Sequence, residues 1–386
     1  MRSNGLLDLQ SDNILKRVLE TEQADFSATA VLAFIGDSGV GKSKLLTAVL
    51  GEPNLLPTSG LHACTSFPIE IRQRENVTEL YKSNEILMNG KHTLETDLRA
   101  DAVNYMQSLV PFTTDEEESK LWPLVKVVKL YVDSEALKTG AILVDLPGLR
   151  DSNAACTTVT RQYMTRANEI VVVTRLTRAV TDETTGELSR EGYIKRLQHG
   201  GGRHLTIVCT CSDQFEPSDA AEDFKGDRQF LEKYHALNHE IDPKQQDRAK
   251  EEISSLEESL QQLCIEARDK YAIKSIAKTY SNLLNEETSI TCYVTSAQHY
   301  LRHISPRKAP GTMSLDQTQI PMLRDYCASA PLEQKSALAA QFVQSILSIQ
   351  SSASLFASNT STSMSEAGRK KAKAEMAKAF TALSNA

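Results

Sequence analysis

The sequence predicts an α/β fold: a mostly parallel β-sheet flanked by helices, with helical inserts and a short helical appendage. Short apolar runs recur along the chain at residues 30–35, 141–144 and 205–209. Continuous apolar runs of this length are typical of strands that are buried on both faces of a parallel sheet. Each run ends in a motif with glycine or aspartate, at the strand end where parallel sheets bind their ligands.

A phosphate-binding motif follows the first run directly. Residues 36–43 are Gly-Asp-Ser-Gly-Val-Gly-Lys-Ser and match the pattern G-x-x-x-x-G-K-S/T. Residues 44–50 predict a helix, so the motif has the strand, glycine turn and helix that it requires. The glycines let backbone N–H groups turn onto phosphate oxygens, and the helix N-terminus adds the positive end of its dipole. The sequence therefore predicts a site for a nucleoside phosphate.

Residues of this loop have individual predicted roles. Lys42 should reach the β- and γ-phosphates and act in catalysis, and the Ser43 hydroxyl should ligate Mg²⁺. The nucleotide-binding residues expected in the loop are Gly36, Asp37, Ser38, Gly39, Val40, Gly41, Lys42, Ser43 and Lys44.

The second apolar run ends in Asp145-Leu146-Pro147-Gly148, a D-x-x-G sequence. At a strand end beside the phosphate-binding loop, Asp145 should lie near the Mg²⁺. The Gly148 N–H should bond the γ-phosphate, which makes Gly148 a catalytic candidate and this segment a sensor of hydrolysis. Taken alone, D-x-x-G is a weak signal, because Asp and Gly are frequent in turns.

Two later segments indicate which base is bound. Thr210-Cys211-Ser212-Asp213 follows the third apolar run and resembles the N/T-K-x-D motif of GTPases. The Asp213 carboxylate would accept hydrogen bonds from the guanine N1–H and 2-amino groups. Adenine offers neither donor, so a buried carboxylate would stay unpaired against ATP. Residues 293–297 follow the fifth guanine motif, where a backbone N–H at Ser296 or Ala297 meets the guanine carbonyl oxygen. Motifs in this order predict a P-loop GTPase fold that binds GTP and GDP, with Thr210 and Asp213 at the base.

Further segments resemble the dynamin-like large GTPases. They are residues 56–65, 122–128, 145–153 and 177–182. The resemblance covers roughly residues 25–327 and is nearest to the nuclear GTPases of the SLIP-GC type and their fungal relatives. It implies that Thr65 is the switch threonine, a catalytic residue that contacts both Mg²⁺ and the γ-phosphate. The alternative is that Thr65 only opens the strand predicted at residues 67–71.

The resemblance implies Mg²⁺-dependent hydrolysis of GTP to GDP and phosphate. The attacking water would be held by a backbone group of the phosphate-binding loop, by Thr65, or by the partner in a homodimer through the GTPase domain. Cys211 replaces the lysine whose stem normally lies along the base, which should weaken guanine affinity. Leu149 stands where many GTPases place a water-orienting glutamine, so turnover should be slow. Arg150, Arg175 and Arg178 are candidate arginine fingers. The alternatives are a catalytically weak GTP- or GDP-binding interaction module and, less consistent with the base motif, an ATP-using enzyme.

Composition narrows the class of protein. The chain has 386 residues and a net charge of −7, which argues against nonspecific nucleic-acid binding. Its seven scattered cysteines are typical of reduced thiols. The sequence shows neither a signal-like N-terminus nor an apolar stretch of transmembrane length. We expect an intracellular protein, in the cytoplasm or nucleus, and leave membrane association open.

The chain divides into four predicted parts. They are an N-terminal helix at 1–24, the GTPase domain at 25–305, a helical appendage at 306–350 and a flexible basic tail at 351–386. A helical insert is expected at about 216–285, with apolar positions spaced as in a helix between Ile253 and Ala267. It is either a hairpin that lies on the domain or an arm for self-association, and it is too short for a confident coiled coil. A second insert, at about 75–120, should hold a helix and a solvated acidic loop.

Overall fold

The computed structural model describes residues 29–53, 55–56, 67–74, 84–88, 93–96, 125–148, 154–179, 185–187, 189–191, 194, 204–241, 250–284, 289–305 and 313–360. Residues 29–330 form one compact unit, and residues 1–28 with 331–386 form another. The predicted N-terminal helix and most of the predicted basic tail lie outside the described residues. No helix in the described part of the chain is long and apolar enough to span a membrane.

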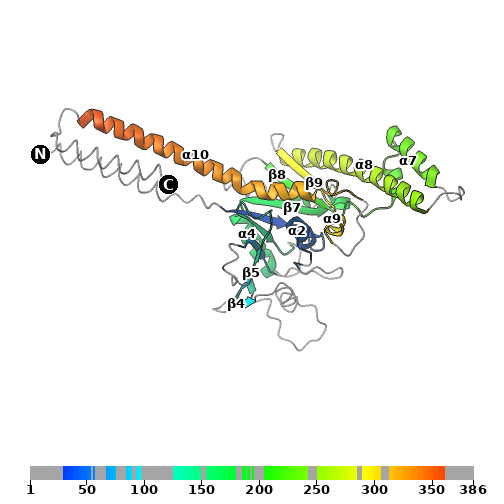
Figure 1. Cartoon of the computed structure of the whole chain (residues 1–386), viewed down its shortest axis with the longest axis horizontal. Coiled ribbons are helices and arrows are strands. Elements are labelled where there is room, and N and C mark those ends of the chain that lie inside the picture. The colour runs from blue at the N-terminus through cyan, green and yellow to red at the C-terminus, as the bar shows by residue number, and fades with distance from the viewer. Residues whose placement is uncertain are drawn as a thin grey trace. The chain divides into compact units, whose positions relative to one another are not determined.

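A mostly parallel sheet forms the centre of the larger unit (Figure 1). Within the described residues it has nine strands in the order β4-β3-β5-β2-β6-β1-β7-β8-β9. The strands are β1 (Ala30–Ile35), β2 (Ile69–Gln73), β3 (Asn84–Met88), β4 (Thr93–Thr96), β5 (Val125–Val132), β6 (Ala141–Asp145), β7 (Glu169–Arg175), β8 (His204–Thr210) and β9 (Ser289–Val294). From β6 to β9 all neighbours are parallel, whereas β2 runs antiparallel to β6 and parallel to β5. The predicted α/β class is confirmed.

Helices cover both faces of this sheet. They are α2 (Lys42–Leu50), α4 (Ala154–Arg166), the 3-10 helix η2 (Leu176–Arg178), α6 (Pro217–Asp223), α7 (Arg228–Ile241), α8 (Lys250–Leu284), α9 (Ala297–His303) and α10 (Ile320–Thr360). Buried side chains of α2, α9 and the first turns of α10 share one core with the sheet. Those of α4 and the C-terminal half of α8 share a second core.

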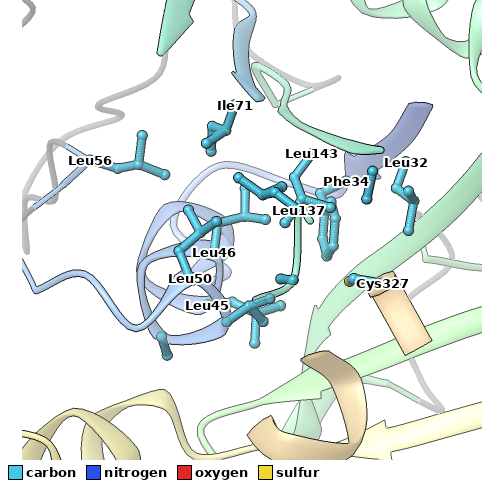
Figure 2. Close-up of a cluster of buried hydrophobic side chains, with 14 of the residues drawn as sticks. Leu32, Phe34, Leu45, Leu46, Leu50, Leu56, Ile71, Leu137, Leu143 and Cys327 are labelled. Atoms are coloured by element: carbon cyan, nitrogen blue, oxygen red, sulfur yellow. The ribbon is translucent and has the colours of Figure 1, made fainter. Parts of the chain in front are cut away.

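The first core fixes the helix that follows the phosphate-binding loop. Figure 2 shows Leu45 and Leu46 of α2 in one buried cluster with Leu32 and Phe34 of β1 and with Cys327 of α10. Each of these side chains is fully buried, and burying a leucine stabilises a fold by about 1.5–3 kcal/mol. The loop between β1 and α2 is therefore held at both ends by close packing.

The insert between β2 and β5 contains a pair of strands that was not predicted from the sequence. β3 and β4 pair antiparallel with each other, and β3 also pairs antiparallel with β5. The sequence signal for this hairpin is Asn89-Gly90, a dipeptide that favours tight turns between paired strands. Residues 84–88 and 93–96 are therefore strands, whereas the rest of the insert, including the acidic run, lies outside the described residues.

The second insert is helical, and α7 and α8 lie side by side (Figure 1). Phe230 and Tyr234 of α7 form a small core with Leu260 and Cys264 of α8. Leu260, Leu263 and Ala267 of the predicted apolar face thus pack against α7 and its neighbours. This packing supports a helical hairpin.

The helix α10 continues to Thr360, beyond the predicted appendage. The prediction of a flexible segment was wrong for residues 351–360. The hydroxyls of Ser351 and Ser352 each donate to the backbone carbonyl four residues earlier, at 2.9 and 2.8 Å. These bonds satisfy the hydroxyls within the helix, and no glycine or proline stands between Pro331 and Thr360 to interrupt it.

Arg324 ties the first turns of α10 to α2. Its Nε donates to the Val49 carbonyl at 2.8 Å, and its Nη2 donates to the Ala48 carbonyl at 3.3 Å. The same guanidinium contacts the hydroxyl and the ring of Tyr300 in α9. A cation is favourable at the last carbonyls of a helix, so this contact stabilises the end of α2.

We expect Arg324→Ala to lower the free energy of unfolding by about 2 kcal/mol, because it removes charge-assisted hydrogen bonds from partly buried carbonyls. Denaturant unfolding of the full chain measures this change. Arg228→Ala, which removes an exposed arginine at the start of α7, is the matched control and should change stability by less than about 0.5 kcal/mol. Equal effects of the two substitutions would show that Arg324 does not anchor α10.

Candidate functional site

The phosphate-binding loop adopts a backbone conformation that requires glycine. Gly39 and Gly41 have φ angles of 77° and 95°, in the left-handed region that other residues avoid. A Cβ on Gly36 would lie 2.2 Å from the backbone oxygen of Val173 in β7. The first glycine of the motif is therefore needed for close packing against the neighbouring strand.

The structure brings Lys42 and Ser43, at the start of α2, close to functional partners. The Ser43 hydroxyl donates to Oδ2 of Asp145 at 2.6 Å, and Asp145 is fully buried at the end of β6. The Lys42 Nζ donates to the carbonyls of Gly36 and Asp37, both at 3.0 Å. A cation, a hydroxyl and a carboxylate thus surround one glycine turn, as the motifs predict.

Gly148 packs directly on the same loop. A Cβ on Gly148 would lie 2.5 Å from the Ser38 Oγ and 2.7 Å from the Ser38 backbone nitrogen. No side chain fits between the two segments, so the glycine of D-x-x-G is required by contact. Behind it, the Thr160 hydroxyl of α4 donates to the Pro147 carbonyl at 3.3 Å.

Hydrogen bonds join the base motif to the loop and to the fifth motif. The Thr210 hydroxyl donates to the Val40 carbonyl at 2.6 Å. The Ser296 hydroxyl donates to Oδ1 of Asp213 at 2.6 Å, and its oxygen accepts the N–H of His299, which caps α9. The carboxylate expected to recognise guanine is therefore oriented by the segment expected to bind its carbonyl oxygen.

Three further residues of these motifs are described by the structure: Cys211, Lys44 and Ala297. Cys211, at the lysine position of the base motif, has a φ of 61°. The Lys44 side chain donates from Nζ to Oε1 of Gln298 in α9 at 2.9 Å. Ala297 is the first residue of α9. Any contact of Lys44 or Ala297 with a nucleotide would therefore be made by the backbone.

Arg175 is the candidate arginine finger that contacts the loop. Its Nε and Nη2 donate to the Gly39 carbonyl at 3.3 and 3.0 Å. Arg178 is exposed in η2, and Arg150 lies outside the described residues.

Arg268 of α8 contacts the base motif and the residues that follow it. It belongs to no recognisable sequence motif. The Arg268 Nη1 donates to the Ser212 carbonyl at 3.3 Å, and its guanidinium lies over the Phe215 ring at 4.2 Å. Burial lowers the pKa of Arg268 and raises the pKa of Asp269 to about 7. Sequence reasoning missed both residues, because a long helix gives no signal for the residue that meets a distant loop.

The available side chains fit Mg²⁺. This ion prefers hard oxygen ligands, and the Ser43–Asp145 contact brings a hydroxyl and a carboxylate together. Among the residues that the structure describes, no group of three or more His, Cys, Asp or Glu could hold a metal ion. The Ser43 hydroxyl and the Asp145 carboxylate suit an ion that takes its remaining ligands from substrate phosphates and water. Thr65, the other predicted ligand, and Leu149 lie outside the described residues.

Comparison with known proteins identifies a related domain. Residues 32–198 match the dynamin family. The matched segment contains the phosphate-binding loop and the D-x-x-G sequence, and it ends before the base motif.

Individual relatives are similar at low identity. The nuclear GTPase SLIP-GC of Homo sapiens is 21% identical over an alignment 386 positions long, which covers 81% of this chain and 45% of that protein. The Mus musculus protein of the same name is 24% identical over 233 residues, covering 59% of this chain and 26% of that protein. The chain thus spans less than half the length of these relatives.

Solved structures give low similarity scores. A chain from an oligomerised bacterial dynamin pair has a TM-score of 0.49 at 16% identity, covering 99% of this chain and 52% of that one. Aquifex aeolicus Era bound to GDP and aluminium fluoride has a TM-score of 0.33 at 12% identity, covering 78% of this chain and 57% of that one. The fold assignment here rests on the strand order and the motif geometry described above.

We expect Gly36→Ala to destabilise the protein by about 2 kcal/mol or more, because the new methyl group would overlap a backbone oxygen that cannot move aside. Gly226→Ala is the control, since a Cβ on Gly226 meets no atom within 4 Å. Thermal unfolding of both variants tests the expectation. If Gly36→Ala is as stable as Gly226→Ala, the close approach of β1 and β7 does not exist.

Proposed function

We propose that the protein binds GTP with Mg²⁺ and hydrolyses it slowly to GDP and phosphate, a proposal supported by the match of residues 32–198 to the dynamin family. The observation that carries this proposal is the joined set of contacts at the sheet edge. Ser43 meets Asp145, Thr210 meets the loop at Val40, and Ser296 meets Asp213. Phosphate-binding and base-binding groups are thus connected in one site.

The loop would bind the phosphates mainly through its backbone. N–H groups of a glycine turn and a helix N-terminus attract phosphate oxygens. The Lys42 ammonium would neutralise negative charge as the bond between the β–γ bridging oxygen and the γ-phosphorus breaks and water adds to the phosphorus. Ser43, Asp145 and Thr65 would hold Mg²⁺, which would neutralise further negative charge on the phosphates.

Gly148 would link hydrolysis to conformation. Its N–H lies in a segment that touches Ser38 of the loop, so it is close to the position expected for the γ-phosphate. A hydrogen bond from this N–H exists only while the γ-phosphate is present. Loss of the phosphate would therefore release the D-x-x-G segment.

An interaction module that binds GTP or GDP with weak turnover is the alternative function. It is favoured by two positions: Leu149, which stands where many GTPases have a water-orienting glutamine, and Cys211, which lacks the cation of the usual lysine. A homodimer through the GTPase domain is the proposed source of missing catalytic groups. An intracellular location, in the cytoplasm or nucleus, also belongs to this proposal.

Base selection is the first test. We expect binding titrations with Mg²⁺ to show a preference for GTP and GDP over ATP on the order of 10³–10⁴-fold, because adenine cannot supply the two donors that guanine offers to Asp213. Asp213→Asn should shift the preference toward xanthine nucleotides, whereas Asp325→Asn, an exposed carboxylate in α10, should not. An unchanged GTP preference in Asp213→Asn would remove Asp213 from the base site.

Turnover is the second test. Phosphate release from GTP, followed over hours across a range of protein concentrations, should be slow, and its specific rate should rise with concentration if a dimer completes the site. Lys42→Ala should release no phosphate above background, which controls for contaminating enzymes. Tight GTP binding without release at any concentration would establish the interaction module instead.

A further inference from the structure

The base motif of this protein lacks the cation that its pattern usually supplies. Cys211 stands at the lysine position, and its short thiol is neither charged nor long enough to cover a purine ring. Another group must perform this role if the protein binds guanine nucleotides tightly. The neighbouring strand offers one.

Arg175 is the last residue of β7 and stands beside the base motif. In the parallel pairing of β7 with β8, Arg175 is directly opposite Thr210, the first residue of that motif. Its guanidinium binds the Gly39 carbonyl, and the Thr210 hydroxyl binds the next carbonyl, that of Val40. Arg175 and the base motif therefore contact the same side of the loop.

The direction of the Gly39 carbonyl shows whether Arg175 contacts the inside or the outside of the phosphate-binding loop. The Val40 N–H donates to the Asp37 carbonyl at 3.5 Å, so it points toward the inside of the loop, where phosphates bind. In a trans peptide the carbonyl of one residue points opposite to the N–H of the next, and the structure describes no cis peptide. The Gly39 carbonyl therefore points out of the loop, and Arg175 contacts that outer side, away from the inward N–H groups expected to bind phosphate.

We propose that Arg175 binds the guanine base and replaces the missing lysine of the base motif. The inference rests on the proposed function, because it assumes a guanine nucleotide in this site. One edge of the guanidinium, formed by Nε and Nη2, is held by the Gly39 carbonyl. The side chain is otherwise exposed, which leaves its flat face available to lie on the purine ring. Arginine is suited to this contact because its planar cation stacks on aromatic rings.

This assignment distinguishes Arg175 from an arginine finger. A finger acts on the charge that develops during phosphoryl transfer, so its loss lowers turnover and leaves nucleotide affinity little changed. A residue that stacks on the base contributes equally to GTP and GDP binding. It contributes nothing to a phosphate ligand that has no base.

The experiment measures dissociation constants of the full chain for GDP, GTP and inorganic pyrophosphate, all with Mg²⁺. Arg175→Ala should weaken GDP and GTP binding by about tenfold or more, as expected for a lost stacking contact, and should change pyrophosphate binding by less than about twofold. Arg175→Lys should lose less affinity than Arg175→Ala. Arg228→Ala, which removes an exposed arginine at the start of α7, is the control and should bind all ligands as the unmodified protein does.

A compensating substitution makes the test specific. Adding Cys211→Lys to Arg175→Ala should restore most of the GDP affinity, because the lysine returns to its usual position. Equal losses for GDP and pyrophosphate would mean that Arg175 only braces the loop, and a loss confined to turnover would make it a finger. Unchanged GDP affinity would also overturn the proposal. If the unmodified protein shows no preference for guanine nucleotides, the proposed function itself fails, and this result is recognised before any variant is made.

Discussion

The site depends on one constraint: a glycine turn must keep its N–H groups directed inward while both flanking elements are buried. β1 and α2 supply the flanks, and their side chains share one core. Gly36 then has to pass within contact of the Val173 backbone, which excludes any side chain. Because the strand and the helix are fixed by packing, the loop is preorganised and does not have to be ordered by its ligand.

The outward carbonyls of the same turn explain how other segments are attached to it. Side chains from other segments donate to two carbonyls of the turn. Arg175 donates to that of Gly39, and Thr210 donates to that of Val40. These two residues are neighbours across β7 and β8, so the satisfaction of loop carbonyls also places the base motif beside the loop.

The order of the motifs and the strands before them could be predicted from the sequence, because both signals are local. The run at residues 30–35 is β1 without any change of bounds, and the runs before Asp145 and Thr210 are β6 and β8. The prediction failed where local composition was ambiguous. The short strands β3 and β4 were not predicted, and the serines near Ser351 continue a helix because it satisfies their hydroxyls.

The sequence by itself determined the phosphate-binding loop, the D-x-x-G segment and the candidate base motif, since each depends on residues within a few positions of one another. Only the tertiary structure decided which distant residues complete them. Gly39 and Arg175 are 136 residues apart, and Ser296 and Asp213 are 83 residues apart. Such pairs meet because strand order and register bring the carboxyl ends of β1, β7, β8 and β9 to one edge of the sheet. No local pattern encodes that order, which results from the packing of all the strands and helices together.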